Sequence, residues 1–498
     1  MNLNFKSLSC LGLGLLGAMG AMAVKKEKPN ILYFLVDDMG WTDTGYQGSK
    51  FYETPNIDKL AQEGVKFTNA YVSHPRCLPS RYSIITGKYP ARDWVPGSNE
   101  KQLKGGETTL AVPFKEAGYS TYFTGKWHLA SNESLPEDQG FEINIGGGHA
   151  GAPTSYFYPY NVRKSGKPGK ERPIHGLDEG VEGEYLTDRL TDETIQYLKK
   201  QHEETPDKPF LAYVSHYAVH TPFQAKEEYV KKFRKKLKTM HYDGPEYISE
   251  GTGQRKMRQD NAIYAAMIYS MDESLGRLVK TLKELGEYDN TIIILFSDNG
   301  GLSNRGTNQR QLATTNTPLK AGKGHLYEGG IREPMLVRWP GVTKAGTETD
   351  AVIIGSDFFP TMLDMAGLPL HPEAHLDGES FVWALKNKAN PNPDRAFFWH
   401  SPTGRPHSTG DSNCSAVRQG DYKLMEFFDQ GRVELYNVKE DISEANNLSE
   451  EMPEKTAEML ETLHNWKKEI DAFKKVKKDK NKKKGKGKGK KGKKVHRH

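Results

Sequence analysis

Four continuous apolar runs, each rich in β-forming residues and each followed at once by polar residues, constrain the fold of this chain most strongly. They are NILYFLVDD, YSTYFTGKWH, PFLAYVSHYAVHTP and NTIIILFSDNG. Unbroken apolar runs of this length are typical of strands buried on both faces of a largely parallel sheet. The segments between them include helical patterns at 56–63, 185–200 and 262–285. We therefore predict an α/β fold in which helices cover both faces of a large, mostly parallel sheet.

Polar side chains follow each of these four strands, at the point where the strand ends. They are Asp37 and Asp38, Lys126 and His128, His216 and His220, and Asp298 and Asn299. Because the carboxyl ends of parallel strands meet at one edge of a sheet, we expect these side chains to converge on one site. The acidic residues and the asparagine offer only oxygen ligands, which suit a hard cation such as Ca²⁺ or Mg²⁺ and not Zn²⁺. A strand-end turn without a ligand role remains the alternative for the Asp37-Asp38 pair.

A cysteine stands at the expected start of a helix, in the stretch PRCLPSRYSIITG. Pro79 suits the first turn of that helix and Gly87 suits its end. The helix dipole favours negative charge near Cys77, and Arg81 lies one turn further on. Such surroundings favour a reactive thiolate. The residues around Cys77 do not, however, match a cysteine-protease motif.

The first 23 residues have the pattern of a secretory signal peptide. One lysine precedes an apolar stretch, and Ala21-Met22-Ala23 supplies a small-x-small cleavage pattern. The apolar stretch is too short to span a bilayer, so we expect export to the periplasm or the medium and no transmembrane segment. The mature chain would keep only Cys77 and Cys414, too few for a disulfide scaffold.

The composition of the chain changes after residue 372. Short strand candidates and an amphipathic helix from Pro453 to about Ala472 indicate a small antiparallel sheet with one packed helix. We therefore divide the chain into a signal peptide (1–23), a catalytic α/β domain (24–372), a C-terminal α+β subdomain (373–473) and a basic tail (474–498).

The tail, residues 474–498, holds fourteen lysines and one arginine against one aspartate, and is predicted to be disordered. Residues 24–473 carry a formal charge of −9, so the net charge of +6 hides two oppositely charged parts. Two interpretations of the tail stay open: contact with a polyanion, or a solvated segment without a specific role. Nucleic acid is not an expected partner, since the tail lacks aromatic residues between its cations and the chain is predicted to be exported.

Several motifs together resemble one family. Cys77-Leu78-Pro79-Ser80-Arg81, continuing to Thr86-Gly87, matches every fixed position of the type I sulfatase motif C-x-P-S-R-x(4)-T-G, and GYSTYFTGKWH is similar to the second motif of that family. The segments DDMGWTD, SDNGG and GKGHLYEGGIREPMLVRWPG also look like sulfatase segments. The chain is thus identified, from about residue 30 to 448, as a member of the formylglycine-dependent sulfatases, close to arylsulfatases and bacterial carbohydrate sulfatases. The resemblance implies an alkaline-phosphatase-like fold.

The resemblance also implies a modified nucleophile. A formylglycine-generating maturation enzyme would oxidise Cys77 to 3-oxoalanine (formylglycine), whose hydrate presents two hydroxyl groups. One hydroxyl attacks the sulfur of a sulfate ester and expels the alcohol. The second is then deprotonated, the hemiacetal collapses, and sulfate leaves. One Ca²⁺ ion, with Mg²⁺ as the less favoured alternative, would be held by residue 77 together with Asp37, Asp38, Asp298 and Asn299.

The remaining site residues receive roles from the same resemblance. Arg81, Lys126 and Lys323 would hold sulfate oxygens and balance charge in the transition state, although either lysine could simply be a solvated surface charge. His128 would accept the proton that triggers collapse of the hemiacetal. His220 would protonate the leaving alcohol, because imidazole suits proton transfer near neutral pH.

Four further residues are weaker candidates for substrate contact: His325, His400, Arg405 and His216. Loop or structural roles are the alternative for each. His216 and His220 have the spacing of a zinc-binding pair on a helix, but Pro222 and the preceding strand pattern argue against a helix there.

We expect an exported sulfatase that acts on a sulfated sugar or polysaccharide. The alternatives are a phosphonate or phosphodiester hydrolase of the same superfamily, which shares the Cys-x-Pro-x-Arg site, and a non-catalytic polyanion-binding protein.

Overall fold

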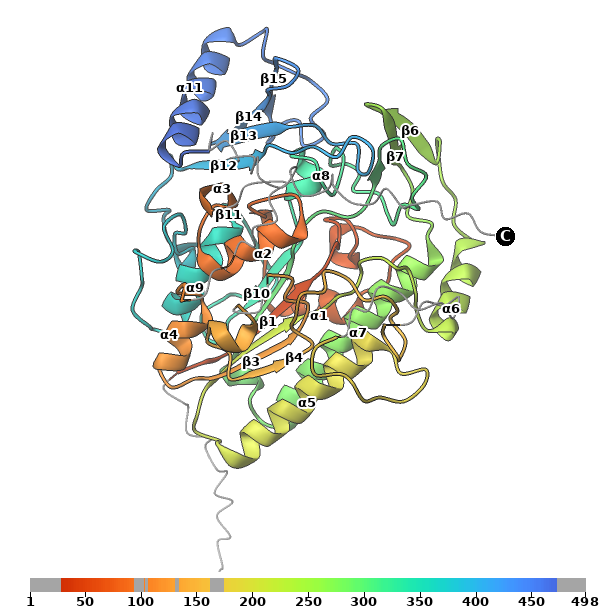
Figure 1. The fold of residues 1–498 in the computed structure, drawn as a ribbon, viewed down its shortest axis with the longest axis vertical. Coiled ribbons are helices and arrows are strands. Elements are labelled where there is room, and N and C mark those ends of the chain that lie inside the picture. Colours follow the sequence, from red (N-terminus) through yellow and green to blue (C-terminus); the bar gives the residue numbers. More distant parts are fainter. Residues whose placement is uncertain (1–27, 94–102, 104–105, 130–133, 162–173, 473–498) are drawn as a thin grey trace, which may run out of the picture.

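The centre of the molecule is an eight-stranded sheet with the order β11-β2-β10-β8-β1-β5-β3-β4 (Figure 1). The computed structural model describes residues 28–93, 103, 106–129, 134–161 and 174–472. Within this sheet β10 is antiparallel to both of its neighbours and every other adjacent pair is parallel. The predicted large, mostly parallel sheet is confirmed. The strands are β1 (Asn30–Val36), β2 (Val65–Tyr71), β3 (Ser120–Gly125), β4 (Ile143–Ile145), β5 (Phe210–Ser215), β8 (Thr291–Ser297), β10 (Met335–Arg338) and β11 (Thr347–Ile354).

The four apolar runs of the sequence form β1, β3, β5 and β8, which are adjacent in the sheet. Every residue of β1 is buried, because the strand has a partner on each side and helices over each face. Alternate residues of β1 enter different apolar clusters: Ile31 and Tyr33 pack on one side, Leu32 and Phe34 on the other. This is the two-sided burial that an unbroken apolar run indicates.

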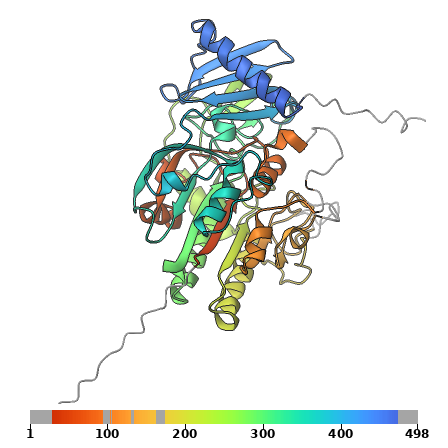
Figure 2. The same ribbon diagram turned by 90° about the vertical axis from the view of Figure 1, so that its left-hand side faces the viewer.

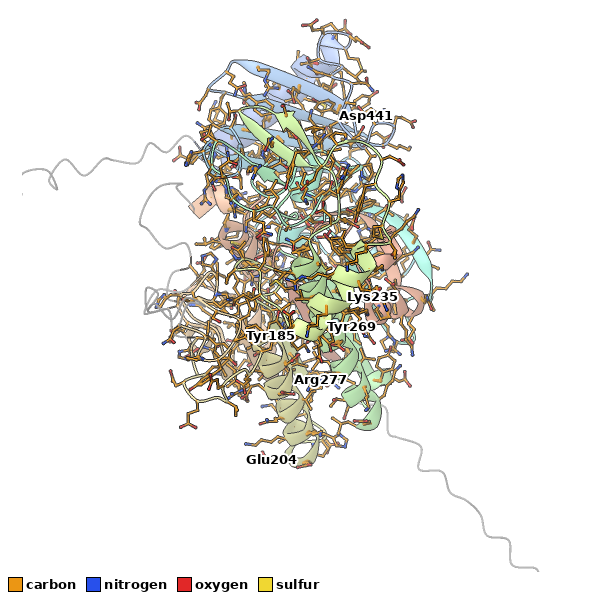
Figure 3. The ribbon with its side chains drawn as sticks, turned by 90° about the vertical axis from the view of Figure 1, so that its right-hand side faces the viewer. Tyr185, Glu204, Lys235, Tyr269, Arg277 and Asp441 are labelled. Atoms are coloured by element: carbon orange, nitrogen blue, oxygen red, sulfur yellow. The ribbon has the colours of Figure 1, made fainter. Side chains whose placement is uncertain are left out.

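One face of the sheet is covered by four helices, three of which correspond to the predicted segments. They are α1 (Pro55–Glu63), α5 (Leu186–Glu204), α6 (Glu227–Leu237) and α7 (Ala262–Glu284). Figure 3 shows α5 and α7 side by side on this face, with Tyr185 and Glu204 at the ends of α5 and Tyr269 on α7. The first turn of α7 is capped by the Asn261 side chain, which accepts hydrogen bonds from the backbone amides of Ile263 and Tyr264.

The opposite face carries shorter helices and the C-terminal unit. The helices are α2 (Cys77–Thr86), α3 (Pro90–Asp93), α4 (Ala111–Glu116), α8 (Glu328–Ile331), α9 (Phe358–Met365) and α10 (Val382–Leu385). Figure 2 shows α11 lying across a separate sheet at one end of the molecule. That sheet is antiparallel, in the order β12-β13-β14-β15, as the sequence predicted. Its elements are β12 (Ala396–Ser401), β13 (Cys414–Gln419), β14 (Tyr422–Phe427), β15 (Arg432–Asn437) and α11 (Pro453–Glu469).

A single apolar core runs from the large sheet into the C-terminal sheet. Trp399 of β12 is fully enclosed, and its indole Nε1 donates to the carbonyl oxygen of Val72 at 2.7 Å. Lys423 of β14 donates to Glu328 of α8 at 2.9 Å. The segment after residue 372 therefore completes the core of the catalytic part.

A third, small sheet fixes the loop that follows β8. It contains β6 (Tyr247–Glu250), β7 (Gly253–Lys256) and β9 (Asn304–Arg305). Within the described residues no helix has the length and apolar character needed to cross a bilayer. The predicted signal peptide (1–23) and basic tail (474–498) lie outside these residues.

Candidate active site

The polar residues that follow the central strands meet at one edge of the sheet, as predicted. Asp37 and Asp38 follow β1, Lys126 follows β3 and Asp298 follows β8, and all four side chains are buried. Lys126 Nζ donates to Asp37 Oδ2 at 2.6 Å. The backbone amide of Asp38 donates to Asp298 Oδ1 at 3.1 Å. The strand order thus brings together side chains that are up to 261 positions apart in the sequence.

Cys77 is the first residue of α2, and Gly87 ends that helix in the left-handed region (φ 68°), as the sequence predicted. The Cys77 Sγ atom lies 3.5 Å from His128 Nδ1. Burial raises the pKa of the Cys77 thiol, but the ammonium groups of Lys126 and Lys323 outweigh burial, so that the net pKa lies below its ordinary value. The position therefore favours negative charge on residue 77.

Arg81 and Lys126 lie behind Cys77 and do not line the cavity in front of it. The Arg81 guanidinium donates to Asp298 Oδ2 at 2.7 Å and to Ser215 Oγ at 2.6 Å. Its Nη2 atom has no hydrogen-bond partner among the described residues. Both side chains are enclosed and each is paired with a buried carboxylate, and their contact with sulfate oxygens stays a prediction.

Lys323 is the predicted cation that does line the cavity, together with His128 and His220. Its Nζ donates to Asp38 Oδ1 at 2.5 Å. His220 donates through Nδ1 to the carbonyl oxygen of Thr221 at 2.8 Å, so its Nε2 faces Asp38 Oδ2 at 3.7 Å. Burial and, after it, the Lys323 ammonium lower the pKa of His220 to about 4, although Asp38 acts in the other direction. The imidazole is therefore neutral at neutral pH before an anion arrives.

His128 is also neutral, because burial and the cations Lys126, Arg81 and Lys323 hold its pKa well below the ordinary value. Its backbone lies in the left-handed region (φ 63°), a conformation that residues other than glycine adopt where the surroundings impose it. A Cβ atom on Gly151 would lie 2.4 Å from His128 Nε2. Residue 151 must therefore be small for the imidazole to keep its place beside Cys77.

The acidic residues have the donor set and the unpaired atoms of a cation site. One ligand atom each from Asp37, Cys77 and Asp298 lies within 4.8 Å of the others. The Asp37 Oδ1 and Asn299 Oδ1 atoms are buried without a hydrogen-bond partner among the described residues. Burial raises the pKa of Asp37 and of Asp298 to about 6. Buried acceptors that lack a partner fit a bound hard cation, so the predicted oxygen-rich site agrees with the geometry.

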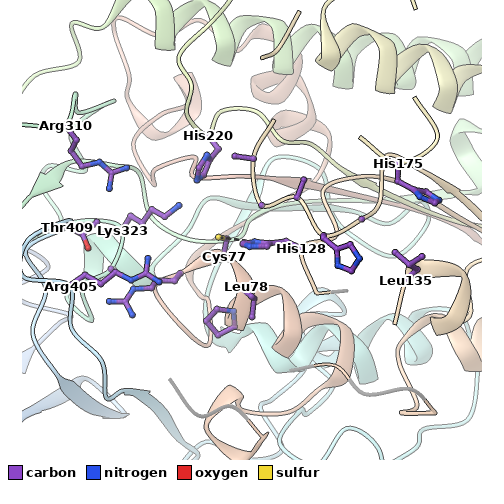
Figure 4. A pocket seen from close by; sticks show the side chains of 18 residues that line it. Cys77, Leu78, His128, Leu135, His175, His220, Arg310, Lys323, Arg405 and Thr409 are labelled. Carbon is purple, nitrogen blue, oxygen red and sulfur yellow. Dashed lines mark hydrogen bonds between the residues drawn. The ribbon is translucent and has the colours of Figure 1, made fainter. Parts of the chain in front are cut away.

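Cys77 lies at the centre of a cavity of about 800 Å³, within the size range of ligand sites. Figure 4 shows Arg310, Thr409 and Arg405 at one end, and Leu135 and His175 at the other. Cys77 and His128 lie between these two ends. The two ends therefore offer different chemistry to the two sides of a bound molecule.

The weaker substrate candidates are divided by the structure. Arg405 lines the cavity. His325 does not: its Nε2 lies 3.0 Å from the carbonyl oxygen of Thr409, so it supports the cavity wall from behind. His216 is fully enclosed and bonds through Nε2 to Ser274 Oγ at 2.9 Å, which excludes direct substrate contact in this conformation and corrects the expectation.

His400 lies outside the active-site cavity. It bonds through Nδ1 to Ser415 Oγ at 2.8 Å and lines a separate hollow beside α11. Its expected role in the catalytic cleft is therefore wrong, because β12 directs it to the other side of the C-terminal sheet.

The cavity residues that sequence reasoning missed include Arg310, His149 and Gly151. Arg310 lies in an irregular loop after β9, and no local pattern marks it. His149 and Gly151 follow the glycine run 146–148, which the sequence analysis did not assign to the site. The glycine-rich loop between predicted strands was the signal that could have indicated His149 and Gly151.

The chain matches the family described as "Sulfatase" over residues 29–368, more than half its length. The chain belongs to the sulfatase family. Residues 321–472 also match the C-terminal region of N-sulphoglucosamine sulphohydrolase. As a sulfatase the protein is a sulfuric ester hydrolase, which removes the alternative of a non-catalytic polyanion-binding protein. The family implies a formylglycine and a metal ion.

Individual sulfatases are similar along most of this chain. A sulfatase from Formosa agariphila is 28% identical, covering 90% of this chain and 90% of the relative. Human N-acetylgalactosamine-6-sulfatase is 31% identical over 74% of this chain and 67% of the relative. The crystal structure of Ps i-CgsB has a TM-score of 0.72 at 31% identity, and covers 88% of this chain and 93% of that one. A phosphonate monoester hydrolase of Agrobacterium radiobacter, 22% identical with a TM-score of 0.60, shares the fold.

Proposed function

We propose that this sulfatase is an exported, calcium-dependent enzyme that hydrolyses O-sulfate esters of a sulfated sugar, using a formylglycine made from Cys77. The observation that carries the proposal is the position of Cys77 on a cavity wall between Lys323 and two neutral histidines, with three buried carboxylates behind it. Related proteins support the sugar substrate: one is named N-acetylgalactosamine-6-sulfatase, and Ps i-CgsB was crystallised with k-i-k-neocarrahexaose.

Asp37, Asp38, Asp298, Asn299 and residue 77 would hold the cation. When bound, Ca²⁺ supplies positive charge that polarises the sulfate and the nucleophile. The proposal is consistent with the charges of the site: three carboxylates face the three cations Arg81, Lys126 and Lys323. A divalent ion would leave the set positively charged, which suits an anionic ester.

Cys77 would reach the reactive state through a maturation enzyme that oxidises the thiol to the aldehyde. Once formed and hydrated, this group supplies the hydroxyl that attacks sulfur. Arg81 and Lys126 hold Asp298 and Asp37 in place, and Lys126 together with Lys323 favours negative charge at residue 77, as the lowered pKa of the thiol indicates. Arg81 Nη2 is the donor left available for an oxygen on residue 77.

The two histidines receive different tasks. His128, neutral and 3.5 Å from Cys77 Sγ, accepts the proton from residue 77 that releases sulfate. His220 has its Nε2 free to take a proton when a sulfate ester, with its negative charge, lies between it and Lys323. That proton then passes to the leaving alcohol oxygen. Lys323 binds a sulfate oxygen from the cavity wall.

The test is sulfate release from a panel of defined sulfated sugars by protein made in a host that contains the maturation enzyme. Mass spectrometry of the peptide around residue 77 should show the aldehyde in active protein. Aryl phosphate and aryl phosphonate esters serve as the control substrates. Turnover of the phosphonate above every sulfate ester, or full activity with an unmodified thiol, would contradict the proposal.

Export and the tail remain part of the proposal. The signal-peptide pattern supports export, and the lysines of residues 474–498 would attract a polymeric anion. A chain without residues 474–498 should then show a raised KM on a sulfated polymer and an unchanged KM on a sulfated monosaccharide. Unchanged kinetics on the polymer would leave the tail as a solvated segment.

A further inference from the structure

Two arginines at one end of the active-site cavity have no carboxylate partner among the described residues. Arg310 donates through Nη1 to Ser408 Oγ at 3.3 Å, and the Arg405 side chain forms no hydrogen bond or ion pair within that part of the chain. The other cations of this wall are paired, as Lys323 is with Asp38. Unpaired guanidinium groups on a cavity wall are suited to an anion from outside the protein.

The loops that carry the two arginines are bonded directly to each other. The amide of Gly306 donates to the carbonyl oxygen of Ser408 at 3.0 Å, and the amide of Asn308 donates to that of His407 at 3.1 Å. A Cβ atom on Gly306 would lie 1.8 Å from the carbonyl oxygen of Pro406, so only glycine permits this approach. The two loops that carry the arginines are therefore held together before a ligand arrives.

The same loops are also tied to the catalytic centre. The amide of Arg405 donates to Asp411 Oδ2 at 3.1 Å. Asp411 forms a buried ion pair with Arg76, the residue that precedes Cys77. An anion bound by the arginine pair would thus lie in a set position relative to residue 77.

The opposite end of the cavity carries no permanently charged side chain among the described residues. It is lined by Leu135, Gly148, His149, Ala150, Gly151, Ala152 and His175. Burial lowers the pKa of Arg310, and the neighbouring Arg405 lowers it further although Asp38 acts in the other direction. A bound anion would relieve the repulsion between the two guanidinium groups. The neutral end has no such repulsion, so an anion is favoured at the arginine end.

We propose that Arg310 and Arg405 form a second oxyanion subsite, which binds an additional sulfate or carboxylate group on the same substrate molecule. The inference rests on the proposed function, because it assigns the first sulfate to Cys77. The substrate class that follows is a sugar or oligosaccharide with at least two anionic groups, the second directed toward the arginine end. The planar guanidinium forks suit either oxyanion.

Three probes distinguish the source of the second anion: N-acetylgalactosamine 6-sulfate, N-acetylgalactosamine 4,6-disulfate, and a uronate-containing disaccharide of the 6-sulfate. The enzyme without substitutions should show a higher kcat/KM on at least one doubly anionic probe. Arg310→Gln and Arg405→Gln should each reduce that preference about tenfold, the ratio that corresponds to roughly 1.4 kcal/mol. The singly charged probe should be affected little. The probe whose advantage is lost identifies sulfate or carboxylate.

Arg234→Gln, an exposed arginine of α6, is the matched control and should leave the preference unchanged. Arg405→Lys should recover part of it, since the charge remains. An equal loss on singly and doubly anionic probes would overturn the subsite, because it would indicate general attraction of anions. The absence of any preference for a doubly anionic probe in the enzyme without substitutions would also overturn the subsite.

An equilibrium measurement keeps the two proposals separable. Calorimetry with the Cys77→Ser chain compares binding of the monosulfate and of the doubly anionic probes without turnover. Tighter binding of a doubly anionic probe, lost in Arg310→Gln, would support the subsite even if no sulfate ester were hydrolysed, which would count against the proposed function alone. Equal binding of all three probes would overturn the subsite.

Discussion

Two buried charge clusters of this sulfatase differ in how completely their polar atoms are bonded. In the cluster between the two sheets, Lys423 contacts Glu328 and Glu444 at 2.9 Å each. The other oxygen of Glu328 accepts from Tyr71 at 2.6 Å, and the other oxygen of Glu444 accepts from the backbone amide of residue 328 at 2.7 Å. All four carboxylate oxygens have donors, so this cluster holds the C-terminal sheet against the catalytic part.

The cluster at the strand ends is incomplete. Asp37 Oδ1, Asn299 Oδ1 and Arg81 Nη2 have no partner among the described residues, and the cluster borders a cavity through Lys323. The charged side chains of both clusters are buried, so burial alone does not identify an active site. Unpaired buried polar atoms beside a cavity are the better indicator, because a ligand bound there can supply the missing hydrogen bonds or coordination.

The largest expected effect is the loss of activity when the strand-end cluster loses its cation. Asp298→Ala, or exhaustive chelation, should lower kcat/KM by about a thousandfold or more, because several kcal/mol of charge stabilisation are lost. The protein without substitutions should also melt at a higher temperature when Ca²⁺ is added, and the Asp298→Ala variant should lose that shift. Recovery of activity with Zn²⁺ but not Ca²⁺ after chelation would break the assignment.

The second prediction concerns the bonded cluster. Lys423→Met should reduce the free energy of unfolding by about 3 kcal/mol, because Glu444 would lose its buried cation and Glu328 would keep only its pairing with Arg332 at 3.4 Å. Adding Glu444→Gln should restore part of the loss. The kcat of the folded fraction and the Ca²⁺-dependent shift should stay unchanged. A loss of kcat at full stability would erase the distinction between the clusters.

The third prediction tests the proton donor at the incomplete cluster. His220→Ala should lower kcat/KM about a hundredfold on a sugar sulfate, whose alcohol needs a proton as it leaves. An aryl sulfate with a good leaving group should lose much less. His216→Ala is the control, since that buried imidazole bonds to Ser274 and should change stability more than the ratio between the two substrates. Equal losses on both substrates for His220→Ala would contradict the role.

The smallest effect concerns the neutral end of the cavity. Gly151→Ala should lower kcat about tenfold, because the added methyl group would meet the His128 ring and displace it from Cys77 by enough to weaken proton transfer. Gly183→Ala is a control for the loss of a glycine: its φ of 87° should make alanine lower the stability, but no atom lies within 4 Å of the added methyl, so kcat of the folded fraction should not change. An unchanged kcat for Gly151→Ala would show that His128 does not need this contact.

The central strands could be predicted from the sequence because two-sided burial requires unbroken apolar residues, as in β1 and β8. The strands β2 and β11 could not be predicted, since buried residues are mixed with half-buried ones in β2 and with half-buried and exposed ones in β11. Their position depends on pairing with each other. The same contrast holds at the site. Asp37 and Asp298 could be predicted because each directly follows an apolar strand. Arg310 lies in a loop whose place at the cavity depends on its contacts with residues 407 and 408.

The sequence by itself determined the family, the strand ends that carry the carboxylates and the helix that begins at Cys77, because these depend on local patterns of burial and on motifs. The tertiary structure decided which cations face the cavity. Arg81 and Lys126 turned out to be enclosed behind Cys77, and Lys323 lines the cavity wall. It also decided that His400 lies on the far side of the C-terminal sheet and that two unpaired arginines lie near residue 77. These outcomes depend on the order of strands and on loop-to-loop hydrogen bonds between residues far apart in sequence, which no local pattern encodes.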